Sequence, residues 1–105
     1  VIAARTEATS LEGMRRMCDR LREKMSSGVI VLGGVFGGRP MIVATVTKDL
    51  VEQGIHAGNI AKSVAQRMGG SGGGRPDMAQ AGGSQPENLD AALESVAAWV
   101  SERLA

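Results

Sequence analysis

Hydrophobic residues recur with helical spacing in three segments of the chain. Apolar positions three and four residues apart predict a helix over 9–25, a second over about 56–68 and a third that ends near 104. Polar residues fill the other positions, so each helix should bury one face. The apolar faces are Leu11, Met14, Cys18, Leu21 and Met25 in the first helix; Ala57, Ile60, Ala61, Val64, Ala65 and Met68 in the second; and Leu89, Leu93, Val96, Ala97, Val100 and Leu104 in the third. Trp99 lies at the edge of the third face, where an amphipathic ring can cover the core.

Polar residues mark where these helices begin. Thr9 with Glu12, and Ser84 with Glu87, match the capping box, in which two side chains satisfy N–H groups that the first turn leaves unpaired. Acidic residues at 49 and 52 would cap a single further helical turn.

Four apolar segments predict strands, over 1–5, 29–32, 41–47 and 78–81. The β-branched run "VIVL" suits a strand that is buried on both faces. A loop over 33–40 connects the second and third strands, and so short a connection favours an antiparallel pair.

The predicted order is β-α-β-β-α-β-α, which indicates an α/β fold: a small mixed sheet of about four strands with helices packed on it. Its 105 residues form one globular domain. Apolar residues make up 43% of the chain but aromatic residues only 2%, so the core must be aliphatic. Scarce aromatic rings also count against binding single strands by base stacking.

The net charge is only +1, but it is unevenly distributed. From Ser84 onward four acidic residues face Arg103 alone, whereas residues 1–83 hold eleven basic and seven acidic groups. A mildly basic body with an acidic last helix permits a polyanionic partner without requiring one.

Cysteine usage and targeting signals give the expected location. Cys18 is the single cysteine, so no internal disulfide forms and nothing indicates an oxidising compartment. No apolar run approaches the roughly 20 residues of a membrane span, and no secretory signal opens the chain. We expect a cytoplasmic protein with no membrane partner. Because the chain starts without Met inside a predicted strand, we expect a fragment of a longer protein.

Residues able to carry catalysis are few, and we expect no catalytic residue and no metal site. His56 is the single histidine, and a zinc site needs about four ligands. Cys18 lies on an apolar helix face and fits a small core residue better than a nucleophile. His56 fits a helix start better than a general base, and Asp77 has no obvious carboxylate partner.

The stretch "GGSGGGRPDMAQAGG", residues 69–83, holds seven glycines and admits three interpretations. A flexible linker is disfavoured, since only 22 residues follow and they cannot form a second domain. Glycines also permit tight turns and close backbone approach. Finally, successive glycine N–H groups can form a nest for phosphate, to which Arg75 would add a bidentate contact. The pattern matches neither a Walker loop nor the dinucleotide fingerprint.

This stretch resembles the signature of the DHH-associated domain at the C-terminus of alanyl-tRNA synthetase. "VIVLGG" and "KDLVEQGIHAGNIAKSVAQRMGG" upstream, and the final "WVSERLA", fit the same family, so the resemblance covers essentially the whole chain. It implies a non-catalytic tRNA-binding module that contacts the outer corner of the tRNA and links aminoacylation with editing. The partners would be tRNA for alanine and the remaining synthetase domains. ATP and zinc would serve those other domains, with no cofactor here.

On this resemblance, the nucleic-acid-binding residues follow from the motif and from nearby cations. Arg75 and the N–H groups of the preceding glycines would meet backbone phosphate. A basic surface would extend over the second helix and the 33–40 loop. The complete set is Gly72, Gly73, Gly74, Arg75, Lys62, Arg67 and Arg39.

Other interpretations stay open. Phe36, Met41 and Trp99 could pack a symmetric dimer, which would make the chain an oligomerisation module. The chain could also be the nucleic-acid clamp of a DHH-type phosphoesterase, but those proteins often carry His after the glycines, where this chain has Arg75. The arginines of the first helix are most simply a solvated face, with a nucleic-acid surface as the alternative.

Overall fold

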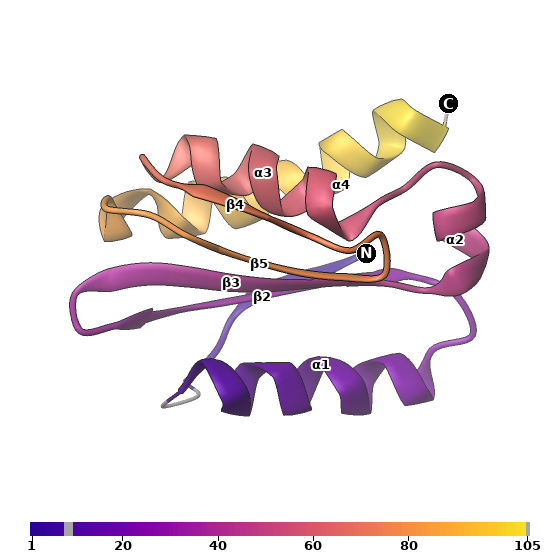
Figure 1. Cartoon of the computed structure of the whole chain (residues 1–105), viewed down its shortest axis with the longest axis horizontal. Coiled ribbons are helices and arrows are strands. Elements are labelled where there is room, and N and C mark those ends of the chain that lie inside the picture. Colours follow the sequence, from indigo (N-terminus) through magenta and orange to yellow (C-terminus); the bar gives the residue numbers. More distant parts are fainter. Residues whose placement is uncertain (8–9, 105) are drawn as a thin grey trace.

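A computed structural model describes residues 1–7 and 10–104. The elements are β1 (Ile2–Arg5), α1 (Leu11–Lys24), β2 (Val29–Phe36), β3 (Arg39–Val46), α2 (Lys48–Glu52), α3 (Ala57–Arg67), β4 (Ser71–Gly74), β5 (Met78–Gly82), a short 3₁₀ helix (Pro86–Asn88) and α4 (Leu89–Leu104). The strands form one five-stranded sheet in the order β1-β2-β3-β5-β4. Helix α1 covers one face of this sheet, and α3 and α4 cover the other (Figure 1). The predicted α/β fold with a mixed sheet is confirmed, with one strand more than expected.

The β2–β3 connection is shorter than the sequence pattern predicts. Strand β1 pairs in parallel with β2, and β2 pairs antiparallel with β3 over its full length, from Val29 opposite Val46 to Phe36 opposite Arg39. The predicted loop over 33–40 was therefore wrong, since only Gly37 and Gly38 lie outside the strands. Their φ angles of 58° and 79° supply the left-handed backbone that a two-residue hairpin turn requires.

Strand β4 is the strand that the sequence pattern did not predict. Its residues, "SGGG", pair antiparallel with β5, from Ser71 opposite Gly82 to Gly74 opposite Ala79. Glycine has poor strand propensity, so no local pattern marks the segment. The flexible-linker interpretation of residues 69–83 is therefore wrong, because most of the stretch is a paired β-hairpin.

Alternating side chains of the central strands supply two separate cores. Val31 and Ala44 face α3 and α4, whereas Ile30 and Val43 face α1. All six predicted residues of the α3 face are buried, and in α1 Met14 and Cys18 are fully buried. In α4 the prediction was wrong at two positions, since Ala97 and Leu104 are exposed.

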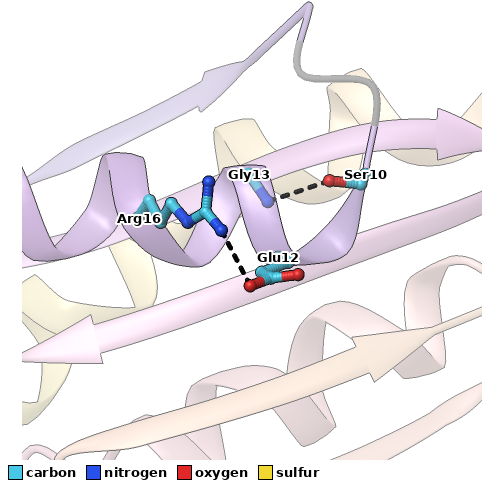
Figure 2. Close-up of polar contacts among 4 residues, drawn as sticks. All are labelled: Ser10, Glu12, Gly13 and Arg16. Atoms are coloured by element: carbon cyan, nitrogen blue, oxygen red, sulfur yellow. Dashed lines mark hydrogen bonds and ion pairs between the residues drawn. The ribbon is translucent and has the colours of Figure 1, made fainter.

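The start of α1 is capped by Ser10. Its hydroxyl accepts a hydrogen bond from the Gly13 N–H at 3.0 Å, while Glu12 pairs with Arg16 at 2.9 Å (Figure 2). The predicted partner Thr9 lies outside the described residues. A cap at this place satisfies one of the N–H groups that the first turn leaves free.

The other two predicted caps are replaced by different contacts. The Ser84 hydroxyl donates to the carbonyl of Gly69 at 3.1 Å, so the predicted box with Glu87 is wrong and a 3₁₀ turn leads into α4 instead. Thr47 is the N-cap residue of α2. Asp49 lies in the first turn, where it accepts hydrogen bonds from the hydroxyls of Thr47 and Ser27.

Candidate nucleic-acid interface

The turn that joins β4 to β5 holds the first turn of α3. The N–H of Ala57 donates to the Pro76 carbonyl at 2.7 Å, and the N–H of Gly58 donates to the Arg75 carbonyl at 3.2 Å. These carbonyls occupy the donors that a helix N-terminus otherwise offers to an anion. The first turn of α3 is thus committed to holding the hairpin in place.

Several glycines of the hairpin allow close packing. A Cβ at Gly72 would lie 2.2 Å from the Cβ of Ala81, and one at Gly74 would lie 2.8 Å from that of Ala79. On the facing helix, a Cβ at Gly58 would lie 2.8 Å from the Gly74 carbonyl oxygen. These positions need glycine because a side chain would push β4 away from its neighbours.

Gly73 differs from the glycines on either side of it. A Cβ built there meets nothing within 4 Å, and its φ is not in the left-handed region. It lies opposite Gln80, which in turn lies opposite Val43, whose side chain faces α1. Gly73 therefore opens on the α1 side of the sheet, whereas Gly72 and Gly74 face the α3 side.

Helix α1 leaves part of its side of the sheet uncovered. It packs against β2 and β3, whereas β5 and β4 follow β3 at one end of the strand order. We call the α1 side of β5 and β4 the open face; its residues are Ser71, Gly73, Met78, Gln80 and Gly82. In the sequence this face had no signal, because it depends on which strands the helix covers.

Two hollows border the open face. One, of about 410 Å³, is lined by residues of α1, β4 and β5 and of the hairpin turn: Arg15, Gly73, Gly74, Arg75, Met78, Ala79 and Gln80. The other, of about 360 Å³, lies at the opposite end of the hairpin and is lined by Arg39, Met41, Gly69, Gly70, Ser71, Gly82, Gly83 and Ser84. Each hollow thus combines glycine backbone with at least one arginine.

The predicted site residues are divided by the fold. Arg75, Gly73 and Gly74 line the first hollow, and Arg39 lines the second. Arg75 is exposed and forms an ion pair with Asp77 at 3.5 Å. Lys62 and Arg67 are exposed on α3, on the other side of the sheet, and line neither hollow.

Arg15 is the lining cation that the sequence pattern did not single out. Its Nη2 lies 3.8 Å from the sulfur of Met78, which is 63 residues away in the chain. The helical pattern placed it off the apolar stripe with other arginines of α1. Only the packing of α1 beside β5 distinguishes it from its neighbours.

A third hollow, of about 880 Å³, contains none of the predicted site residues. Its lining mixes cations and carboxylates: Arg22, Met25, Ser26, Val46, Thr47, Lys48, Asp49, Glu52 and Asp77. Hydrogen bonds from Ser27 and Thr47 lower the pKa of Asp49 below its usual value. This mixture of charges does not favour a polyanion.

Residues suited to catalysis are not gathered in the described part of the chain. There, no group of three or more His, Cys, Asp or Glu residues could hold a metal ion. Burial raises the pKa of the Cys18 thiol to about 11, so this thiol is protonated and unreactive near neutral pH.

Among the described helices, none is long and apolar enough to cross a membrane.

The apolar residues considered for a dimer are not fully exposed. Phe36 and Met41 are half-buried against the α1 core, and Trp99 is half-buried against the other core. Trp99 also carries Arg103 over its ring, 3.6 Å from the centroid. The surface that these three side chains offer to a partner is correspondingly small.

Comparison with known proteins gives the family. Residues 1–102 match the model of the DHHA1 domain, and the chain belongs to this family. It is 53% identical over 104 residues to an alanine–tRNA ligase of Bacillus subtilis (strain 168) and 52% identical over 105 residues to one of Colwellia psychrerythraea. These matches cover 99% and 100% of this chain but only 12% of each ligase.

A solved structure supports the same assignment. The crystal structure of the C-Ala domain from Aquifex aeolicus alanyl-tRNA synthetase is similar to this fold, with a TM-score of 0.78 and 26% sequence identity. The match covers 89% of this chain and 84% of that one. The resemblance predicted from the glycine stretch is thereby confirmed.

Proposed function

We propose that this chain is the tRNA-binding C-terminal module of an alanine–tRNA ligase. The relatives named above support this assignment, and the chain spans 12% of their length. It would contact the outer corner of tRNA for alanine and link aminoacylation with editing, without catalysing either reaction. ATP and zinc would be used by the remaining domains of the parent enzyme, in the cytoplasm.

The proposal rests on one observation: in the β4–β5 hairpin, Arg75 directly follows glycines whose backbone is not covered by side chains. The N–H of Arg75 donates to the Met78 carbonyl, so Gly73 and Gln80 form the next hydrogen-bonded pair. By the same alternation, the N–H groups of Gly72 and Gly74 point away from β5, toward the sheet edge. Arg75 beside these donors gives a phosphate both charge and hydrogen bonds.

The remaining cations of the proposed interface lie at different places on the surface. Arg39 lines the second hollow at the other end of the hairpin. Lys62 and Arg67 would serve RNA that reaches across the sheet edge to α3. Contacts of this kind supply affinity and position, not sequence reading. We therefore expect little discrimination among tRNAs by this domain alone.

A salt titration of binding to labelled tRNA for alanine tests the proposal. The logarithm of the association constant should fall linearly with the logarithm of salt concentration, because phosphate contacts release counterions. Arg75→Ala should bind more weakly and lower the slope by about 1, while Arg20→Ala, also an exposed arginine, is the charge-matched control. Circular dichroism verifies that both variants are folded. Binding that does not respond to salt would contradict phosphate recognition.

Two competing functions have their own tests. An oligomerisation module would form dimers in light scattering at high protein concentration, but the half-burial of Phe36, Met41 and Trp99 does not favour one. The clamp of a DHH-type phosphoesterase is less favoured, because the relatives named above are ligases. Single-stranded DNA that competes as well as tRNA would favour the clamp.

A further inference from the structure

The arginines of α1 differ in the groups that their side chains contact. Arg16 is paired with Glu12 (Figure 2), and Arg22 lies 3.8 Å from Asp19. Arg15 lies within ion-pair distance of no carboxylate among residues 1–7 and 10–104; its guanidinium contacts the sulfur of Met78 instead. A thioether is a weak acceptor and takes only one N–H, so the other donors of this guanidinium are left for water or a ligand.

The hollow beside Arg15 is open where a side chain would normally close it. Gly73 lines it, and a Cβ at this position would meet no atom within 4 Å. Since nothing in the packing of β4 requires glycine there, the missing side chain leaves room for a ligand. That ligand would meet Arg15 on one side and Arg75 on the other.

The charges around the hollow favour an anion. Its lining contains two arginines and no carboxylate. Asp77 lies next to it and pairs with Arg75 at 3.5 Å, but both side chains are well exposed. An exposed ion pair of this kind is weak and leaves further donors of Arg75 available.

We propose that this hollow seats one phosphate of the RNA backbone, held between Arg15 of α1 and Arg75 of the hairpin. The proposal rests on the tRNA-binding function and adds to it a residue, Arg15, and a direction of approach. The RNA backbone lies over the open face of β5 and β4, on the α1 side of the sheet. Lys62 and Arg67, on the α3 side, then contribute little at this seat.

Substitution of Arg15 tests this seat against a matched control. Arg15→Ala should weaken binding of tRNA about tenfold at moderate salt, since a hydrogen bond between charged groups is lost. Arg20 lies in the same helix but lines none of the three hollows. Arg20→Ala removes the same charge, and its affinity for tRNA should stay within about twofold of that of the parent chain. Equal affinities for the two variants, with tRNA still bound by the parent chain, would overturn the seat and leave the proposed function intact.

Two further substitutions act without removing a cation from the site. Gly73→Val fills the hollow with a residue that suits a strand, and it should weaken binding about as much as Arg15→Ala while the melting temperature is retained. Asp77→Asn frees Arg75 from its carboxylate and should tighten binding severalfold. Tighter binding cannot result from misfolding, so an unchanged or weaker affinity of Asp77→Asn counts against the seat.

A probe without RNA separates the seat from the function. Inorganic pyrophosphate, titrated into the ¹⁵N-labelled chain, should shift the amide signals of Gly73 and Gly74, and Arg15→Ala should abolish these shifts. Shifts without any tRNA binding would support the phosphate seat but contradict the proposed function. Shifts that are the same in Arg15→Ala would contradict the seat whatever its effect on tRNA.

Discussion

At the scale of single residues, the glycines of β4 have two different physical roles. A Cβ at Gly72 would collide with Ala81 at 2.2 Å, whereas Gly73 has open space. Gly72→Ala should therefore lower the free energy of unfolding by at least about 1–3 kcal/mol, the usual cost of overpacking. Gly73→Ala should stay within about 1 kcal/mol of the parent, because alanine restricts the unfolded chain without a clash. Urea denaturation followed by circular dichroism measures both values.

The pair of variants controls for the loss of glycine itself. Both replace a glycine of the same strand by the same residue, so their difference reports the neighbours and not the backbone preference. If Gly73→Ala proved as destabilising as Gly72→Ala, the hairpin would need backbone freedom along its whole length. The hollow beside Gly73 would then be a consequence of strand conformation and not a place kept free for a ligand.

At the scale of elements, the carboxylate of Asp49 links the first turn of α2 to Ser27, in the segment between α1 and β2. Ser27 and Thr47 donate to it and lower its pKa. The stabilisation is complete above the unfolded pKa, near 4, and is lost as pH falls through the lower folded pKa. The free energy of unfolding should therefore fall on acidification below pH 4 more steeply in the parent than in Asp49→Asn.

A substitution in the same helix provides the comparison for that acid titration. Glu52→Gln also removes a carboxylate from α2, but neither Ser27 nor Thr47 is bonded to Glu52. Its stability should follow the parent below pH 4. An identical acid response in the parent and in Asp49→Asn would show that the hydroxyl contacts do not favour the ionised carboxylate.

The helices could be predicted from sequence because their signal is local. The apolar face over 57–68 is buried at every predicted position, since helical periodicity directly reports which residues point inward. Strand β4 could not be predicted, because its residues have no strand propensity and are ordered by β5 and α3. The cap at Ser84 failed for a similar reason: its hydroxyl bonds to Gly69, a partner that only the tertiary fold supplies.

At the scale of the whole molecule, the candidate site was only partly predictable. The glycine stretch and Arg75 form a local motif, so the sequence could indicate both. The grouping of Arg39, Lys62 and Arg67 into one surface could not be tested from sequence, and the sheet places the last two on the opposite side from Arg39. Arg15 stayed hidden because its position beside the hairpin depends on α1 lying over β2 and β3, next to β5.

The sheet also couples the two cores, and this predicts cooperative unfolding. Met14 is fully buried in the α1 core, whereas Trp99 packs against the core on the other side. Because β2 and β3 send alternate side chains to both cores, neither core can lose its order alone. Met14→Ala should lower the free energy of unfolding by about 2–5 kcal/mol, and Trp99 fluorescence should report the same urea midpoint as circular dichroism.

Met17→Ala, at an exposed methionine of the same helix, is the control and should change the free energy of unfolding by less than about 0.5 kcal/mol. Separate midpoints for the two probes in Met14→Ala would mean that the α1 layer unfolds on its own while the α3–α4 layer persists.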